Sequence, residues 1–320
     1  MLELYGPCTA PLQDLEEGLR QILISEEKLV QDLNNHLLSA PGKRIRPALF
    51  FLTLNLWQEE YQPFLPVATA IELIHTATLV HDDVIDDSGQ RRGSPTINAK
   101  WGNYVSVLTG DYLFAKAFAL LTEFGDLRII QHMAGLVVAM SEGEIQQQSE
   151  RFHPALETDA YYKRIGKKTA HFFTVSAQCG GLISGADNHS LAALRSYGFN
   201  LGMAFQIIDD LLDFTGDTKL TGKPTAGDLR QGVVTLPLIH LMKESSNGNI
   251  YRKRIAAKEI DEQLVLQICT EINNSQIQNQ VRAIAKEYIN NALQALQSLP
   301  GGTSRNILEQ VTAYVLERRN

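Results

Sequence analysis

The chain has 320 residues, of which 44% are hydrophobic and 20% are charged, and its formal net charge at pH 7 is -7. This composition can supply a sizeable hydrophobic core and excludes a disordered chain. A surface that binds nucleic acid needs clustered excess Lys and Arg, so the negative charge disfavours a nucleic-acid partner. Any anion that the protein binds must therefore be held by local groups of cations.

The sequence contains no pattern that predicts export or membrane insertion. Its opening residues include an acidic segment, Asp14–Glu17, and no basic region followed by an apolar one, so no secretion or transit signal is predicted. The most apolar stretches, such as Pro47–Trp57, fall short of the roughly 20 residues that span a bilayer. Three cysteines without metal-ligand spacing fit a reducing compartment. We expect a cytoplasmic protein with at most peripheral membrane contact.

The hydrophobic pattern predicts an almost entirely helical protein. Apolar residues recur every three or four positions, as in the segment 67–77, and alternating strand patterns are few. Gly and Pro breaks, among them Pro63–Pro66, Gly180–Gly181 and Pro300–Gly302, separate about ten or more helices. Because no linker or repeat divides the chain, we expect one all-α domain over residues 1–320.

Two acidic clusters with the pattern Asp-Asp-x-x-Asp end apolar segments at 82–86 and 209–213, and the second helix is expected to begin near Leu201. Residues four apart share one helix face, about 5–6 Å apart at Cβ, so the outer Asp residues of each cluster form a pair. A single cluster is equally typical of a solvated helix end, but two arise by chance in roughly one chain in a thousand. Carboxylates without Cys or several His favour Mg²⁺, which bridges carboxylates to phosphates. The pattern predicts a polyphosphate substrate.

Cations that could hold such a substrate occur in three compact segments, Gly42–Pro47, Arg91–Gly93 and Lys167–Thr169. Arg binds phosphate oxygens with two parallel donors, and Lys supplies a mobile point charge. Each segment alone is more typical of a solvated surface patch. Together with the two acidic clusters, they predict a diphosphate site.

In order and spacing, these segments resemble the trans-isoprenyl diphosphate synthases, also called polyprenyl synthetases. The resemblance covers nearly the whole chain and rests on GKRIRP at 42–47, ELIHTATLVHDDVIDD at 72–87, RRG at 91–93, GDYLFAKAF at 110–118, KKTA at 167–170, FQIIDDLLDFTGD at 205–217 and GKPTAGDLRQGVVTLP at 222–237. Within the family, residues 82–101 are most similar to component 2 of the two-subunit heptaprenyl diphosphate synthases, with homomeric octaprenyl and nonaprenyl synthases next.

The resemblance implies a bundle of long helices around a central cavity, usually a homodimer or a heterodimer with a small second subunit. It implies three Mg²⁺ ions on the allylic diphosphate, held by Asp82, Asp83, Asp86, Asp209, Asp210 and Asp213. Further contacts to this diphosphate are implied for Arg91, Lys168, Thr169, Gln206 and Lys223. The residues implied for isopentenyl diphosphate are Lys43, Arg46, His75 and Arg92. A lone His on an apolar helix is usually a core residue, but His75 lies about two turns before Asp82 on the same face, which favours a ligand role.

The implied reaction needs no enzyme nucleophile. Cations stabilise the departing pyrophosphate, the allylic C–O bond ionises, and the double bond of isopentenyl diphosphate attacks the carbocation. A proton is then lost to the released pyrophosphate. Water must be excluded from the cavity, and the basic end Arg318–Arg319 is a candidate cover, although a solvated tail is an equal alternative.

Product length is expected to depend on the helix that carries the first acidic cluster. Ala77 and Thr78 are small where short-chain members of the family often have aromatic residues, with Ile74 as a lower wall. Ordinary core packing explains each position equally well. The small residues favour a long product, heptaprenyl diphosphate, for the side chain of a quinone such as menaquinone.

One departure and two competing functions stay open. Val233 stands where many family members have a Lys, so one phosphate contact is missing, as also in the heptaprenyl component 2 proteins. A non-catalytic partner subunit is a first alternative, although such relatives typically lose one acidic motif. A terpene cyclase or head-to-head condensing enzyme is a second, although these enzymes lack the sites at 42–47 and 91–93.

Overall fold

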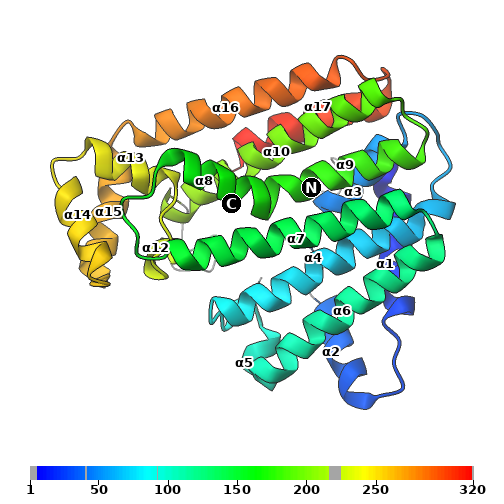
Figure 1. Ribbon diagram of the computed structural model, residues 1–320, viewed down its shortest axis with the longest axis horizontal. Helices are drawn as coiled ribbons and strands as arrows, with labels where there is room; N and C mark the ends of the chain where they lie inside the picture. The colour runs from blue at the N-terminus through cyan, green and yellow to red at the C-terminus, as the bar shows by residue number, and fades with distance from the viewer. Residues whose placement is uncertain (1–5, 40–41, 92, 216–224, 319–320) are drawn as a thin grey trace. The chain divides into compact units, whose positions relative to one another are not determined.

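The computed structural model describes residues 6–39, 42–91, 93–215 and 225–318. These residues are almost entirely helical (Figure 1), which confirms the predicted all-α class. The sheet of the described residues is one antiparallel hairpin of β1 (Gln90–Arg91) and β2 (Ser94–Pro95). The chain forms two compact units. The expectation of a single domain stays a prediction.

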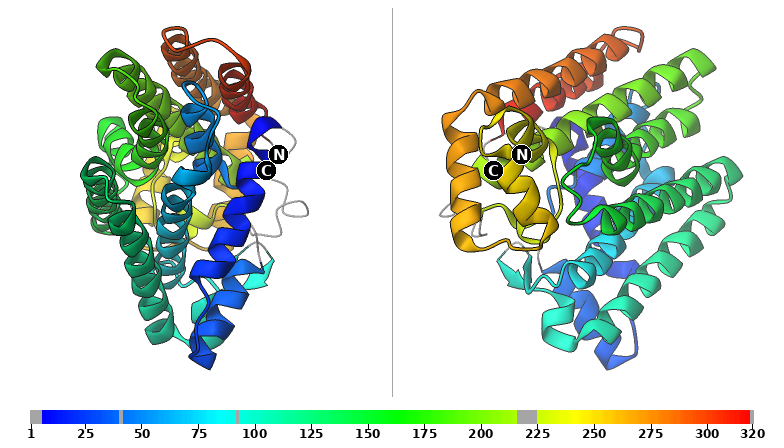
Figure 2. Two further views of the ribbon diagram at one scale, coloured as in Figure 1. Left: turned by 90° about the vertical axis from the view of Figure 1, so that its right-hand side faces the viewer. Right: turned by 60° about the vertical axis from the view of Figure 1, so that its left-hand side comes forward.

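Unit 1 comprises Met1–Val137, Val175–Ala192 and Leu299–Leu308. Its complete helices are α1 (Thr9–Ile22), α2 (Lys28–Leu38), α3 (Ile45–Leu54), η2 (Gln62–Phe64), α4 (Leu65–Ile85), α5 (Ile97–Trp101) and α6 (Asn103–Phe124). The β1–β2 hairpin follows the end of α4 (Figure 2). This unit carries the first acidic cluster and the segment 42–47.

Unit 2 comprises Val138–Thr174, Ala193–Ser298 and Glu309–Asn320. Its complete helices are α8 (Thr158–Ile165), the π-helical turn η3 (Gly166–Ala170), α12 (Gly227–Arg230), α13 (Leu236–Glu244), α14 (Gly248–Ala256), α15 (Glu262–Asn274) and α16 (Ile277–Leu296). Four helices contribute residues to both units: α7 (Leu127–Glu150), α9 (His171–Ile183), α10 (Asn188–Thr215) and α17 (Thr303–Glu317).

Helices α4 and α6 lie side by side in unit 1 (Figures 1 and 2). A glycine allows their close approach, because a Cβ atom on Gly110 would lie 2.1 Å from Nε2 of His81. That imidazole nitrogen also lies 3.0 Å from the carbonyl oxygen of Val107. The contact holds the last turns of α4, where the first acidic cluster begins, against α6.

Two predicted helix boundaries are wrong. Helix α10 begins at Asn188 rather than near Leu201, and α9 continues through Gly180–Gly181. In both helices the glycines permit close backbone packing instead of ending the helix. A Cβ atom on Gly180 would lie 2.4 Å from the carbonyl oxygen of Phe50, and one on Gly198 would lie 2.6 Å from Cα of Thr174.

Two helical segments, Gln62–Ile85 and Asn103–Phe124, are long and apolar enough to cross a membrane by length and composition alone. This differs from the sequence-based estimate, which found no sufficiently long apolar stretch. The most apolar window of the first segment is 56% buried within the protein, as in the core helix of a soluble protein. The corresponding window of the second is 33% buried, and its exposed side chains are considered below.

Candidate active site

The first acidic cluster spans the last turn of α4 and the residue that follows the helix, Asp86, in unit 1. Asp82 and Asp86 are half-buried, whereas Asp83 is 5% exposed. The guanidinium of Arg91 on β1 donates from Nε to Oδ1 of Asp83 at 2.8 Å. Thus the β1–β2 hairpin brings the expected Arg91 to the acidic cluster, where it bonds to the buried Asp83, while Asp82 and Asp86 are the more exposed carboxylates of the cluster.

The residues expected to bind isopentenyl diphosphate also belong to unit 1. Nη1 of Arg46, in the first turn of α3, lies 3.2 Å from Nε2 of His75 on α4. Lys43 lies two residues before α3 and is exposed. The structure therefore brings together Arg46 and His75, whereas Arg92 lies outside the described residues.

The second acidic cluster ends α10 in unit 2, and its central carboxylate is buried. Asp210 is 3% exposed. It accepts hydrogen bonds from Oη of Tyr161 at 2.7 Å and from Nε2 of Gln206 at 2.6 Å. Oγ1 of Thr169 donates to Oε1 of Gln206 at 2.7 Å. Three residues named from the sequence, Thr169, Gln206 and Asp210, thus form one hydrogen-bonded chain, to which the structure adds Tyr161.

Burial raises the pKa of Asp210 to about 7. The hydrogen bonds from Tyr161 and Gln206 oppose this shift, and the nearby charge of Asp209 adds to it. Burial also raises the pKa of Asp228 well above its ordinary value, as do the charges of Asp213, Asp210 and Asp209. The carboxylates of this unit are crowded, and such a cluster favours a bound cation.

The two outer carboxylates of the second cluster have different partners. Asp213 accepts the backbone N–H groups of Gly227 at 3.0 Å and Asp228 at 3.1 Å. Oδ1 of Asp209 accepts a hydrogen bond from Nη2 of Arg318 at 3.0 Å. The guanidinium of Arg318 also lies 4.3 Å from the centre of the Phe205 ring. The C-terminal arginine that was a candidate cover therefore contacts the acidic cluster.

The lysines of segment 167–170 lie in the π-helical turn η3. Nζ of Lys168 forms an ion pair with Glu144, and Nζ of Lys167 lies 2.8 Å from Oε2 of Glu142. Single π-helical turns are frequent at functional sites. Lys168 is held beside α7 by this pair, whereas Lys223, which was expected to act with it, lies outside the described residues.

The carboxylates fit Mg²⁺ as a partial set of ligands. Within residues 6–39, 42–91, 93–215 and 225–318, no three Asp, Glu, His or Cys side chains are grouped closely enough to hold a metal ion. Mg²⁺ normally keeps several waters and takes one or two carboxylates together with substrate phosphates, so it needs no complete protein cage. Paired carboxylates at each helix end, with crowding at the second, match that requirement.

The residues expected to govern product length differ in exposure. Ile74 and Ala77 are fully buried in α4, whereas Thr78 is half-buried and donates from Oγ1 to the carbonyl oxygen of His75 at 2.8 Å. Thr78 precedes Asp82 by four residues and therefore shares its face. Of these residues, Thr78 is best placed to contact a ligand bound at Asp82.

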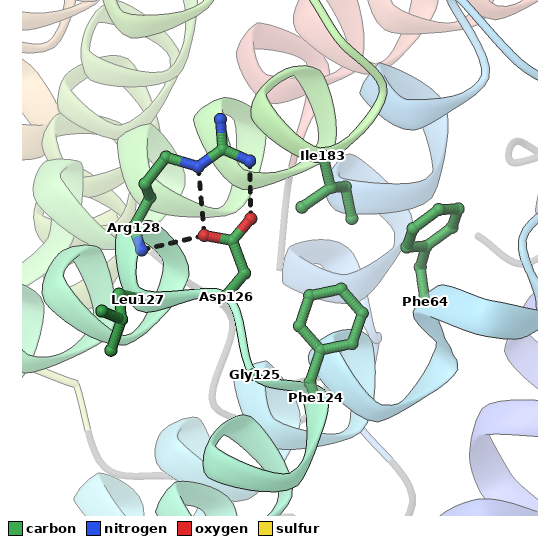
Figure 3. A pocket seen from close by; sticks show the side chains of 7 residues that line it. All are labelled: Phe64, Phe124, Gly125, Asp126, Leu127, Arg128 and Ile183. Carbon is green, nitrogen blue, oxygen red and sulfur yellow. Dashed lines mark hydrogen bonds and ion pairs between the residues drawn. The ribbon is translucent and has the colours of Figure 1, made fainter.

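A pocket of about 540 Å³ lies in unit 1 near the start of α4 (Figure 3). Phe64, which lines it, precedes Asp82 by 18 residues, roughly 27 Å along a helix. The two charged residues that line this pocket bond to each other, because Arg128 donates hydrogen bonds to Asp126 from both its side chain and its backbone. The remaining lining residues are Phe124, Gly125, Leu127 and Ile183. The pocket is thus separate from the residues of the acidic cluster.

Sequence reasoning missed several buried polar residues around the candidate site. Arg164 is 2% exposed and donates to Oε2 of Glu150 and to the carbonyl oxygen of Val234, each at 2.7 Å. Tyr161 and Arg44 are likewise buried and bonded to carboxylates. Val233 is 4% exposed, so its side chain packs in the core and supplies no phosphate contact.

Comparison with known proteins places these features in one family. Residues 27–272 match the family model "Polyprenyl synthetase". The chain is 37% identical to heptaprenyl diphosphate synthase component 2 of Bacillus subtilis (strain 168) over 98% of this chain and 90% of that one. It is 36% identical to octaprenyl diphosphate synthase of Escherichia coli (strain K12) over 99% of both.

Similarity to a solved structure supports the same family assignment. The polyprenyl synthase of Caulobacter crescentus CB15, complexed with calcium and isoprenyl diphosphate, matches with a TM-score of 0.94 and 32% identity. The match covers 100% of this chain and 98% of that one. The chain therefore belongs to the polyprenyl synthetase family and is a prenyltransferase that makes a polyprenyl diphosphate.

Proposed function

We propose that the chain condenses an allylic diphosphate, farnesyl diphosphate, with successive isopentenyl diphosphates to give all-trans heptaprenyl diphosphate for a quinone side chain. The observation that carries the proposal is the combination, on α4 and its neighbours, of the Arg46–His75 pair with an intact acidic cluster bonded to Arg91. A regulatory subunit or a terpene cyclase does not need both features.

In this proposal the allylic diphosphate is held between carboxylates and cations. Asp82 and Asp86 in one unit, and Asp209 and Asp213 in the other, would hold Mg²⁺, which would supply positive charge to the leaving pyrophosphate. Asp83 and Asp210, which are buried, hold the ends of their helices as well as contributing to the metal sites. Arg91, Lys168, Thr169, Gln206 and Lys223 complete the contacts to this diphosphate.

The second substrate is held by a separate group of cations. Lys43, Arg46, His75 and Arg92 bind the diphosphate of isopentenyl diphosphate and orient its double bond toward the allylic carbon. A bound, oriented pair of substrates reacts as if in one molecule, which lowers the entropic part of the barrier. The surrounding apolar residues exclude water, which would convert the carbocation to an alcohol.

Small side chains on α4 support a long product. Ala77 and Thr78 are small side chains about one turn before Asp82, where a larger side chain would obstruct a growing chain, and Ile74 lies one turn further down. The relatives include both a heptaprenyl component 2 and an octaprenyl synthase. Octaprenyl diphosphate is therefore the second candidate product. It is favoured because the match to the octaprenyl diphosphate synthase covers 99% of both chains.

The test is product analysis with the purified chain, Mg²⁺, farnesyl diphosphate and labelled isopentenyl diphosphate. We expect heptaprenyl diphosphate, and we expect Asp82→Asn to reduce turnover at least about a hundredfold. A folded chain that elongates nothing alone, but does so when a second subunit is added, would identify a two-component enzyme. If the second subunit is present and turnover is unaffected by Asp82→Asn, the chain is a non-catalytic regulatory subunit, which would contradict the proposal.

An exposed apolar face supports assembly into a dimer. On α6, Tyr104 is 80%, Val107 43% and Leu108 50% exposed. Contiguous exposed apolar residues mark surfaces that bind another protein or a membrane. We expect a second copy of the chain or a small second subunit to cover this face. Light scattering tests whether the purified chain forms a dimer. If a second copy covers the face, Leu108→Glu should shift the purified protein toward the monomer.

A further inference from the structure

Arg44 occupies an unusual position in the basic segment 42–47. It lies just before α3 with φ of 51° and ψ of 31°, a left-handed conformation that residues other than glycine rarely adopt. Its side chain is 8% exposed, although the neighbouring Lys43 is exposed. Such a backbone conformation persists only where surrounding contacts impose it.

Two carboxylates from different helices surround the guanidinium of Arg44. Nε and Nη2 donate to the two carboxylate oxygens of Glu16 on α1, at 2.6 and 3.1 Å. Nη1 donates to Oε1 of Glu72 on α4, which is 3% exposed. The guanidinium thus uses Nε and both Nη atoms on carboxylates, so Arg44 differs in role from a residue that binds a diphosphate.

This ion-pair group is adjacent to the expected site for isopentenyl diphosphate. Glu72 and His75 are three residues apart on α4 and so lie on the same face. Arg44 contacts Glu72, and Arg46, two residues later, contacts His75. Two arginines from one short segment therefore contact the same face of α4 about one turn apart. The Arg44 contacts determine how α3 begins and hence where Lys43 and Arg46 lie.

We propose that Arg44 is a positioning residue for the isopentenyl diphosphate site, and that Glu16 of α1 acts in that site through Arg44. The inference rests on the proposed function, which assigns Lys43, Arg46 and His75 to this substrate. Arg44 itself does not touch the diphosphate. It holds the segment 42–46 in the conformation in which the neighbouring cations meet the substrate.

The first test compares Arg44→Lys with the unaltered chain in steady-state kinetics and in calorimetric binding of isopentenyl diphosphate, which requires no turnover. Lys keeps the charge but cannot pair with both carboxylates through a planar fork. We expect the KM and Kd for isopentenyl diphosphate to rise about tenfold, as for other residues that orient ligand-binding groups. The KM for the allylic diphosphate should change less than about twofold, and kcat at saturation less than about threefold.

The second test uses Glu16, because Arg44→Lys risks unfolding a buried charge group. Glu16→Gln should raise the KM for isopentenyl diphosphate selectively, by about threefold or more, and its effect should be non-additive with that of Arg44→Lys. Glu17→Gln is the matched control. Glu17 is the next residue of α1 but is exposed and pairs with Arg20, so no change is expected.

Three outcomes are distinguished. A selective loss of isopentenyl diphosphate binding in both variants supports the positioning role. Lower melting temperatures with both KM values unchanged would show a purely structural ion pair and overturn it. Arg46→Ala separates the proposed function from this inference. If that variant binds isopentenyl diphosphate normally, the substrate site itself is wrongly assigned and the role of Arg44 fails with it.

Discussion

The hydroxyl group of Tyr161 lies 2.7 Å from Oδ2 of Asp210 and is fully buried with it. This bond joins α8 to the end of α10 within one unit. Because hydrogen bonds to a carboxylate favour its charged form, Tyr161 counteracts the effect of burial on Asp210. The tyrosine is therefore expected to keep the second acidic cluster competent to bind a cation.

Tyr161→Phe should weaken metal binding without preventing folding. Loss of the hydroxyl raises the pKa of Asp210 further, so Mg²⁺ must compete with a more tightly held proton. We expect the Mg²⁺ concentration for half-maximal activity, and the Mn²⁺ Kd measured by electron paramagnetic resonance, to rise roughly tenfold at pH 7. The difference in Mn²⁺ Kd between Tyr161→Phe and the unaltered chain should become smaller at higher pH.

Tyr197→Phe is the matched control for this prediction. Tyr197 is also fully buried in the same unit, and its hydroxyl accepts a hydrogen bond from Thr312 at 3.2 Å. Its removal should lower the melting temperature by a few degrees and leave the Mn²⁺ affinity unchanged. Equal loss of affinity in both variants would mean that Tyr161 acts only on stability.

The metal-free protein should lose stability as pH rises from about 5 to 8. The pKa of Asp210 is about 7 in the folded chain, above its ordinary value of 3.8. The folded state therefore binds more protons than the unfolded state between these values, and stability falls with increasing pH there. In EDTA, we expect the melting temperature to decrease over this range and Asp210→Asn to flatten the decrease.

Comparison of the two proteins removes the contribution of residues that do not interact with Asp210, so the difference reports Asp210 together with its effect on the pKa of Asp228. The melting temperature of Asp210→Asn minus that of the unaltered chain should be a few degrees larger at pH 8 than at pH 5.5. Mg²⁺ should diminish the decrease in the unaltered chain. A difference that is independent of pH would exclude Asp210 as the source.

Thr78→Phe should shorten the product. Thr78 shares the Asp82 face and is half-buried, so an aromatic ring fits there at less cost than at the fully buried Ala77. The ring would block a chain growing down α4 about one turn below the acidic cluster. Chromatography of the products should show chains shorter by several isoprene units, with initial elongation retained.

Thr76→Phe is the control for product length. Thr76 is also half-buried and also bonds to its own helix, from Oγ1 to the carbonyl oxygen of Glu72 at 2.9 Å. It points to another face of α4, because two residues along a helix correspond to about 200° of rotation. Its product distribution should match that of the unaltered chain. Shortening in both variants would indicate general disturbance of α4 rather than a block.

The motifs were predictable from the sequence because they combine chemistry with short-range spacing. The paired carboxylates follow from the helical repeat, and the Thr169–Gln206–Asp210 chain agrees with the residues that the family resemblance implied. Helix boundaries at glycines were not predictable. In the sequence, Gly180 and Gly198 look like glycines that end a helix. Only the structure shows that each lies within a helix, where the backbone of a facing helix leaves no space for a side chain.

The supporting residues were missed for a related reason. In the sequence, Arg44 cannot be distinguished from the basic residues beside it. Its partner Glu16 is 28 residues away in the chain. Tyr161 likewise meets Asp210 across 49 residues. Burial of a polar side chain depends on tertiary packing, so a sequence pattern indicates which cations are present but not which of them bind carboxylates.

Arg318→Ala should strengthen metal binding by the second acidic cluster. Arg318 is 6% exposed and supplies a positive charge to Asp209, whose side chain is 50% exposed. A half-exposed pair contributes only about 0.5–1 kcal/mol, so removal of the competing cation should tighten Mn²⁺ binding about two- to fivefold. The melting temperature in EDTA should fall, because the buried stacking on Phe205 is lost.

Arg282→Ala distinguishes release of Asp209 from loosening of the C-terminal helix. Arg282 donates from Nη1 to the carbonyl oxygen of Leu316 at 3.2 Å, near the end of α17. This variant should also lower the melting temperature, but the Mn²⁺ Kd should stay unchanged because Asp209 keeps its partner. Weaker metal binding in Arg318→Ala would contradict competition and show instead that the arginine helps to shape the cation site. Equal tightening in both variants would assign the effect to movement of α17.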